Sequence, residues 1–152
     1  MITTSIEKFC DIFEEMKSLN KVHYEEISEH AKHGISLNPD YPAYFAKENA
    51  GELLVIVLRD TGKLVGYYIG LIGHSLHYKD CLQCAMDIIY VDPNFRGQSG
   101  GKLLMDRLKS ECGQRGIRVM TMGCKNAHKI YMEKLLIESG FNAYETHYSF
   151  WL

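Results

Sequence analysis

Two apolar segments joined by a short turn constrain the fold of this chain more than any other feature. Residues 52–59 (ELLVIVLR) and residues 64–72 (LVGYYIGLI) are rich in β-branched and aromatic side chains, which favour β-strands. The residues between them, Asp60-Thr61-Gly62-Lys63, are typical of a β-hairpin. We therefore predict two antiparallel strands in one sheet.

Helices are predicted before this hairpin. Apolar residues recur at helical spacing over residues 6–16, which predicts a first helix with Thr4 or Ser5 as its cap. A second helix is expected over residues 22–32. The prolines and aromatic residues of the stretch 33–50 indicate a loop with a short helical turn.

The second half of the chain is predicted to alternate between strands and helices. A third strand is expected over residues 83–91, and the next helix carries Leu104, Leu108 and Cys112 on one face. A strand, a helix and a last strand follow over residues 118–123, 127–138 and 144–151. The predicted order is helix, helix, three strands, helix, strand, helix, strand, which is an α/β fold.

Composition and charge exclude several classes of protein. A chain of 152 residues with 46% hydrophobic residues and no linker fits one domain over residues 1–152. Seventeen Lys and Arg against nineteen Asp and Glu give a net charge of −2, which provides no attraction to nucleic acid or to an anionic membrane. The longest apolar run, residues 53–58, is too short to span a bilayer. We expect a cytoplasmic protein that binds neither nucleic acid nor membrane.

The five cysteines indicate reduced thiols and no metal site. Their number is odd and their spacing does not fit a disulfide framework. Cys81 and Cys84 form one CxxC pair, but the sequence of a zinc site normally contains a second such pair, and none is present here.

Three glycines, Gly97, Gly100 and Gly101, lie between a predicted strand and a predicted helix. In that position backbone N–H groups and the helix dipole can hold a phosphate, although a plain tight turn also requires glycine. The sequence contains no GxxxxGK[ST] motif, and no GxGxxG motif follows the first strand, which excludes a nucleoside triphosphate loop and disfavours a dinucleotide fold. The candidate ligand of this turn is therefore a phosphate-bearing molecule other than a nucleoside triphosphate or a dinucleotide.

Residues 91–104 (VDPNFRGQSGGKLL) resemble the acetyl-CoA-binding motif of the GNAT acyltransferase superfamily. The order of elements, Asn126 after the next strand and the pair Gly140-Phe141 reinforce the resemblance. It implies an α/β domain whose twisted, mostly antiparallel sheet is splayed to admit the pantetheine and is flanked by helices. Residues 77–79 and 86–91 are also similar to small GNAT proteins of tailed-phage genomes.

The resemblance implies that acetyl-CoA is the cosubstrate and that an amine attacks its thioester directly. The cofactor contacts would come from the third strand, the glycine-rich turn and the segment after the next strand: Ile89, Tyr90, Val91, Arg96, Gly97, Gln98, Ser99, Gly100, Gly101, Lys102 and Asn126. Arg96 and Lys102 also fit ordinary surface cations.

Ser99 departs from the family pattern, because it occupies a usual glycine position. If Ser99 needs a positive φ, it carries a strain of about 1 kcal/mol. Its hydroxyl could donate to a phosphate or cap the helix. We expect the turn to bind pyrophosphate nevertheless.

Asp87 is the best-placed carboxylate for a general base. A period of two would put it on the same face of its strand as Ile89 and Val91, near the expected thioester. Burial in an apolar strand would suit proton transfer, but a structural hydrogen bond explains a buried acid equally well. His77 and His74 are alternative bases, and solvent exposure is the commoner fate of a loop histidine.

The departing thiolate benefits from a proton donor, and relatives often place a tyrosine on the helix after Asn126. Tyr131 is the only tyrosine there, but counting back from Gly140-Phe141 puts the usual position at Leu136. Packing or exposure of Tyr131 is the alternative reading. His128 fits either a solvated side chain or a cofactor contact. A thiol is also a fair leaving group without assistance.

The predicted function is acetyl-CoA-dependent N-acetylation of a primary amine, on a small molecule or on a protein. By the resemblance, the acceptor pocket would form from residues 23–44 and 73–80. The alternative is a catalytically silent GNAT-fold module that binds CoA or a protein partner, which Ser99 and the shifted Tyr131 favour. The oligomeric state is left open, a homodimer included.

Overall fold

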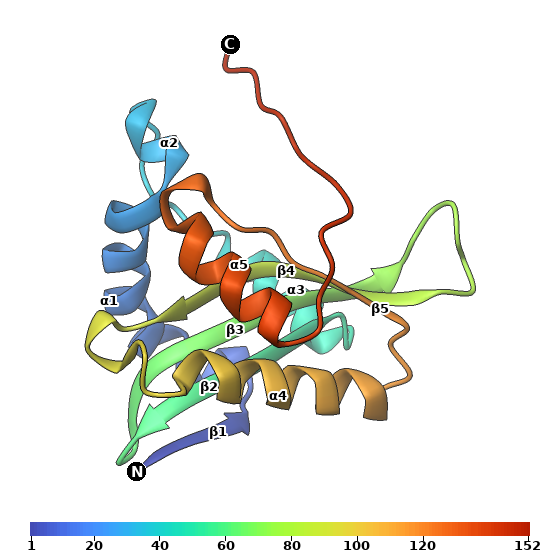
Figure 1. Cartoon of the computed structure of the whole chain (residues 1–152), viewed down its shortest axis with the longest axis horizontal. Helices are drawn as coiled ribbons and strands as arrows, with labels where there is room; N and C mark the ends of the chain where they lie inside the picture. Colours follow the sequence, from blue (N-terminus) through green and yellow to red (C-terminus); the bar gives the residue numbers. More distant parts are fainter.

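The computed structural model describes residues 1–152, apart from the side chain of Ala127. Five strands form one sheet in the order β1-β2-β3-β4-β5 (Figure 1). The strands are β1 (Ile2–Ile6), β2 (Leu53–Asp60), β3 (Lys63–His74), β4 (Leu82–Val91) and β5 (Val119–Thr121). The helices are α1 (Phe9–Ile27), α2 (Glu29–Lys32), α3 (Tyr41–Asn49), η1 (Pro93–Phe95), α4 (Gly100–Gln114), η2 (Asn126–His128) and α5 (Lys129–Glu138).

The predicted hairpin is confirmed and forms the middle of the sheet. β2 and β3 pair antiparallel, with Asp60 opposite Lys63. Thr61 and Gly62 between them have φ values of 46° and 88°, and two positive φ values are what a type I′ hairpin turn requires. Residues 53–58 of β2 and 64–70 of β3 are all buried, so the apolar runs of the sequence are those of a sheet covered on both faces.

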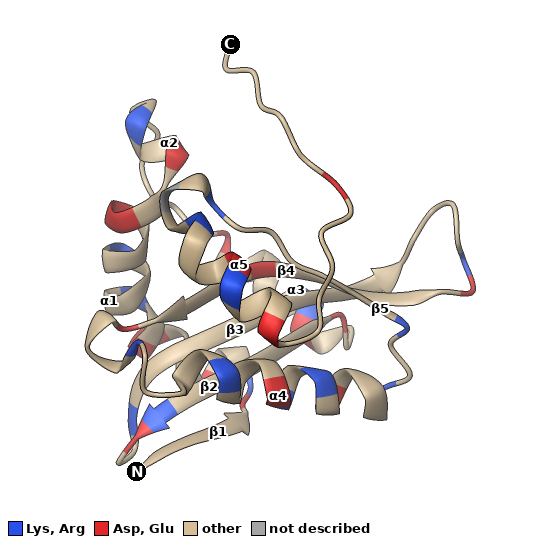
Figure 2. Cartoon of the chain, in the orientation of Figure 1, with Lys and Arg blue, Asp and Glu red and all other residues tan. Residues whose placement is uncertain are grey.

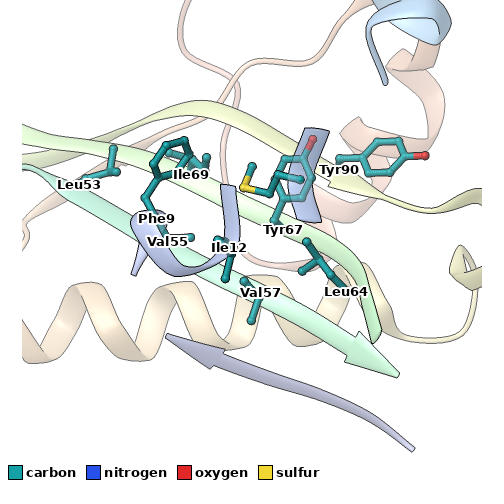
Figure 3. Close-up of a cluster of buried hydrophobic side chains, with 10 residues drawn as sticks. Phe9, Ile12, Leu53, Val55, Val57, Leu64, Tyr67, Ile69 and Tyr90 are labelled. Carbon is teal, nitrogen blue, oxygen red and sulfur yellow. The ribbon is translucent and has the colours of Figure 1, made fainter. Parts of the chain in front are cut away.

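Helices cover both faces of the sheet and create two cores. On one face α1 and α3 pack on β2, β3 and β4, and Figure 3 shows Phe9 and Ile12 of α1 beside Val55 and Tyr67 of the strands. On the other face the predicted stripe of α4 is buried, with Leu104, Leu108 and Cys112 packed against Leu54, Ile56 and Tyr68. The mixed, mostly antiparallel sheet flanked by helices confirms the predicted fold class.

The N-terminus was predicted incorrectly. Residues 2–6 form strand β1 and pair with β2, whereas the apolar spacing predicted a helix capped by Thr4 or Ser5. The helix starts at Phe9, with Lys8 as its N-cap, and ends at Ile27, so it joins the first predicted helix to the beginning of the second. The rest of the second predicted helix is the separate helix α2. Ile6 belongs to the opposite core from Phe9, so its place in the helical pattern was coincidental. Of the helices described, none has the length and apolar character that crossing a membrane requires.

The predicted last strand is also wrong. Residues 141–152 have no regular structure and extend away from the sheet toward α2 (Figure 1). Tyr148 and Phe150 are exposed, and the Trp151 ring stacks on His33 with 4.0 Å between centroids. Aromatic, alternating residues form a strand only where a neighbouring edge pairs with them and buries one face, and this segment has no such neighbour in the described chain.

Candidate active site

The sheet opens between β4 and β5. These parallel strands pair only through Gln83–Val119, Cys84–Met120 and Ala85–Thr121. Beyond Ala85, β4 continues for six residues to Val91 without a partner on that side, and Figure 1 shows the chain after β5 diverging from β4. Ile89, Tyr90 and Val91, predicted to contact the cofactor, lie in this unpaired half. An open strand edge offers backbone N–H and C=O groups to an extended ligand.

The turn after β4 presents a row of backbone donors. Asp92 caps the short helix η1 by accepting from the Asn94 N–H, and α4 begins at Gly100. In the described structure the N–H groups of residues 97–102 donate to neither a carbonyl nor a side chain. Unpaired N–H groups at the N-terminus of a fifteen-residue helix are suited to binding an anion.

Glycine is required at three positions of this turn for two different physical reasons. Gly97 has a φ of 77°, which favours glycine, and open space lies where a Cβ would stand. At Gly100 a Cβ would lie 2.8 Å from Leu58 Cδ2, and at Gly101 it would lie 3.0 Å from Leu135 Cδ2. Glycine at these two positions therefore lets α4 approach the sheet and α5 closely. This close approach brings the N–H groups at the start of α4 next to the opening of the sheet. The residues of the turn fit a pyrophosphate.

Ser99 adopts the left-handed conformation, with φ 66° and ψ 0°. Ser99 therefore has the positive φ that was considered from the sequence, and it carries the expected strain of about 1 kcal/mol. Of the two roles considered for its hydroxyl, capping is not observed, because the Ser99 side chain makes no capping hydrogen bond to α4. Its hydroxyl is left for a ligand or for solvent.

Replacing Ser99 by glycine should raise the free energy of unfolding by about 1 kcal/mol, because glycine adopts this φ without steric cost. Acetyl-CoA affinity should change by less than about tenfold, since the backbone donors stay in place. Chemical denaturation and calorimetric titration measure the two quantities. A gain of about a hundredfold in affinity would instead mean that serine damages the natural turn.

The two cations of the turn are engaged within the protein. Arg96 makes two hydrogen bonds to Glu26 of α1, at 2.6 and 2.8 Å, and its Nε donates to the Val91 carbonyl at 2.8 Å. This pairing raises the pKa of Arg96 and lowers the pKa of Glu26. Lys102 pairs with Asp106 one turn along α4. A phosphate at the turn would therefore be bound first by backbone N–H groups.

Asp87 occupies a β-bulge, which corrects its predicted orientation. Ile69 pairs with Ile88 and Gly70 pairs with Met86, so Asp87 has no partner on β3. The extra residue reverses the alternation of β4. Ile89 and Val91 belong to the core on the α4 side, whereas Asp87 accepts a 2.5 Å hydrogen bond from the Tyr44 hydroxyl of α3.

Asp87 is exposed, so the expectation of a buried carboxyl is also wrong. Tyr44 is more enclosed and packs on Phe9 with 4.7 Å between ring centroids. Burial, and then the bond to Asp87, raise the pKa of Tyr44. The tyrosine therefore stays a donor and orients a carboxylate that solvent or a ligand can reach.

The other predicted catalytic residues lie apart from Asp87. Tyr131 is 79% exposed on the first turns of α5. His77 lies in the exposed loop between β3 and β4, and neither side chain has a hydrogen bond to Asp87 among the described residues. An open hollow of about 710 Å³ lies beside this loop, lined by Leu76, His77, Tyr78, Lys79, Asp80, Cys81, Arg118 and Val119.

The segment after β5 faces the turn across the opening of the sheet. Asn126 begins η2, the short helix that precedes α5. His128 at the end of η2 places its Nε2 atom 3.1 Å from Glu26 Oε1. Glu26 lies in the segment predicted for the acceptor pocket, but these contacts were not predicted, because no local pattern shows that an α1 carboxylate meets residues 96 and 128. Among the described residues no cluster of His, Cys, Asp or Glu fits a metal ion.

His23 begins the segment predicted for the acceptor pocket, and its burial in this region was not predicted. It is 8% exposed, and its ring lies 4.9 Å from the Tyr90 ring. Burial lowers the pKa of His23 from 6.5 to about 4, although the Glu26 carboxylate acts in the opposite direction. The imidazole is therefore neutral in the folded protein at neutral pH.

This buried histidine should make the protein acid-sensitive. In the unfolded chain His23 takes up a proton below about pH 6.5, whereas in the folded protein it does so only near pH 4. Its stabilising contribution is therefore complete above pH 6.5 and is lost as the pH falls to 4, by about 3 kcal/mol. Denaturation at several pH values should show this loss in the natural protein and not in His23→Phe, while loss of equal size in both would contradict it.

Comparisons with known proteins are consistent with this geometry. A family model described as the acetyltransferase (GNAT) family matches residues 11–136. No curated protein sequence matches the chain. Three similar solved structures show the same fold at low sequence identity.

The first is an aminoglycoside acetyltransferase from an uncultured soil metagenomic sample, in complex with trehalose. It is 15% identical with a TM-score of 0.77, over 99% of this chain and 95% of that one. The second is a ribosomal-protein-alanine N-acetyltransferase from Brucella melitensis biovar Abortus 2308, which is 17% identical with a TM-score of 0.74, over 100% and 99%. The third is a predicted acetyltransferase with acetyl-CoA from Clostridium acetobutylicum, which is 14% identical with a TM-score of 0.71, over 99% and 96%.

Proposed function

The chain belongs to the GNAT acetyltransferase family, and we propose that it transfers the acetyl group of acetyl-CoA to a primary amine. The observation that carries this proposal is the continuity of two features. The unpaired edge of β4 leads directly into the turn whose N–H groups, from residue 97 to residue 102, have no partner in the described chain. A ligand with an extended arm that ends in a pyrophosphate fits this arrangement, with the arm along the edge of β4 and the pyrophosphate at the N–H groups of the turn.

Acetyl-CoA is the cosubstrate of this family and supplies an acetyl group activated as a thioester. In the proposed site, backbone groups of Ile89, Tyr90 and Val91 bind the pantetheine arm. The turn binds the pyrophosphate through the N–H groups of Gly97, Gln98, Ser99, Gly100, Gly101 and Lys102. Asn126 contacts the cofactor from the opposite wall of the opening. Arg96 does not contact the pyrophosphate first but holds the turn in position.

Asp87 is the proposed general base. A primary amine is mostly an ammonium ion at neutral pH and must give up one proton before its nitrogen can attack the thioester, and an exposed carboxylate at the start of the unpaired half of β4 can accept that proton. The Tyr44 hydroxyl fixes the orientation of that carboxylate from α3. His77 is the alternative base, because its loop borders the hollow in which an acceptor could bind.

Tyr131 is the proposed proton donor to the departing thiolate. Its place on α5, just after the segment that faces the turn, supports this role, whereas its exposure favours a thiolate that leaves without assistance. Tyr131→Phe separates the two. A fall in kcat of about a hundredfold would identify an acid catalyst, and an unchanged kcat would assign unassisted departure.

The acceptor is proposed to be an amine on a small molecule or on a protein. Two of the structural neighbours are an aminoglycoside acetyltransferase and a ribosomal-protein-alanine N-acetyltransferase, which are named for acceptors of both kinds. Nucleic acid is a poor acceptor for this surface, because the net charge is −2 and Figure 2 shows acidic and basic residues alternating along α4. A second copy of the chain is not required by any step.

The second candidate function is a silent module that retains the fold and binds CoA or a protein. The exposed Tyr131 and the non-glycine Ser99 favour it. A panel of small amines and peptides, incubated with acetyl-CoA and a thiol-reactive reporter, distinguishes the two. An enzyme releases free CoA thiol with at least one amine and a silent module with none.

A further inference from the structure

One carboxylate from α1 contacts both walls of the opening in the sheet. Glu26 binds Arg96 through both of its oxygens, at 2.6 and 2.8 Å, and its Oε1 atom lies 3.1 Å from His128 Nε2. Arg96 belongs to the turn after β4, and His128 belongs to the segment after β5. β4 and β5 themselves do not pair at this end. Glu26 therefore provides the contact between two segments that the sheet leaves apart.

On the first wall, the contact immobilises the turn. Arg96 is held by Glu26, by the Val91 carbonyl and by the Tyr90 ring, which lies 5.6 Å from its guanidinium carbon. These three contacts use both ends of the planar guanidinium and leave it little freedom. The next residue is Gly97, where the row of unpaired N–H groups begins. The conformation of Arg96 therefore determines where that row starts.

On the second wall, the contact fixes the entry to α5. His128 is the N-cap residue of α5 and makes no capping hydrogen bond with its side chain. Its ring is directed instead to Glu26, across the opening. The same short segment carries Asn126. The Glu26 contact therefore fixes the part of the chain that faces the turn.

We propose that Glu26 is a positioning residue that holds the two walls of the acetyl-CoA groove at a fixed separation. Its charge has no other partner among the described residues. The Glu26 side chain is only 22% exposed, and two parallel hydrogen bonds to a guanidinium are stronger and more directional than a single surface ion pair. A groove held in advance binds its ligand more tightly, because less chain must be ordered when the ligand arrives.

The chain offers a matched control for this proposal. Glu25 precedes Glu26 on α1 and is exposed, and its side chain makes no hydrogen bond or ion pair among the described residues. Glu26→Gln removes the charge that both walls share and keeps the size of the side chain. Glu25→Gln removes the same charge from the neighbouring position, so any general effect of charge on an anionic ligand appears in both variants.

The test is a calorimetric titration of acetyl-CoA into the full-length protein, with thermal unfolding to show that each variant is folded. Glu26→Gln should raise the Kd for acetyl-CoA by about tenfold, and Glu25→Gln should leave it unchanged. In acetyl transfer, the KM for acetyl-CoA should rise by a similar factor while kcat at saturation stays the same. A merely structural role would lower the unfolding temperature without moving the Kd.

His128→Gln provides a second variant that removes one contact from a partly exposed residue. It should raise the Kd by a smaller factor, and adding it to Glu26→Gln should have no further effect, because both remove the same link. Additive effects, or a normal Kd in Glu26→Gln, would overturn the proposal. The proposal rests on acetyl-CoA as cosubstrate, so failure of the natural protein to bind acetyl-CoA would overturn that assignment first, and the role of Glu26 with it.

Discussion

Replacing Asp87 by asparagine should lower kcat by about a hundredfold or more, with little change in acetyl-CoA affinity. Asparagine keeps the size of the side chain and can still accept the hydrogen bond from Tyr44, but it cannot take a proton from the amine. Asp87 contacts α3 and lies before the residues proposed to hold the cofactor. The loss should therefore fall on the chemical step.

Two further variants sharpen this prediction. Tyr44→Phe removes only the orienting hydrogen bond, so its kcat should fall between that of the natural protein and that of Asp87→Asn. Asp11→Asn removes an exposed acid from the first turn of α1 and should not affect turnover. Steady-state kinetics at saturating acetyl-CoA measures all three. Turnover in Asp87→Asn equal to that of Asp11→Asn would remove Asp87 from the mechanism.

The second large effect is expected at the start of α4. Ser99→Asp places a carboxylate beside the unpaired N–H groups, where it competes with the pyrophosphate for donors and repels its charge. Aspartate and asparagine both tolerate the left-handed conformation found at this position. The fold should therefore persist in Ser99→Asp and Ser99→Asn, which differ only in charge.

We expect Ser99→Asp to raise the Kd for acetyl-CoA by about a hundredfold relative to Ser99→Asn, a difference of about 2.7 kcal/mol. The difference should shrink as salt is added, since it arises from charge. Calorimetric titration at low and high ionic strength measures it. Equal affinities in the two variants would mean that the pyrophosphate binds away from this turn.

Local patterns in the sequence predicted the centre of the molecule. The hairpin at Thr61 and Gly62 depends on neighbouring residues only, and the buried stripe of α4 repeats over several turns with Leu104 and Leu108. The glycine-rich turn was recognised for the same reason, because its residues are contiguous. These features need no information about distant partners.

Features that depend on distant contacts were not predicted. β1 forms because β2 offers it an edge, and the helical spacing around Ile6 does not show that edge. The bulge at Asp87 depends on the register of β4 against β3, so period-two counting assigned the wrong face. Glu26, His23 and Tyr44 lie in the segment predicted for the acceptor pocket, but their contacts were not predicted, since each meets its partner from a separate helix. The strand predicted over residues 144–151 does not form, because strand-forming residues need a neighbouring strand to pair with and composition does not show whether one is present.

Transfer of an isotopically labelled acetyl group from acetyl-CoA to a panel of primary amines tests the central claim most directly. The proposed function predicts a labelled amide with at least one amine, detected by mass spectrometry, and its loss in Asp87→Asn. Labelled acetyl that remains on CoA with every amine, in a protein that binds acetyl-CoA normally, would contradict enzymatic N-acetylation and assign the chain to a silent CoA-binding module.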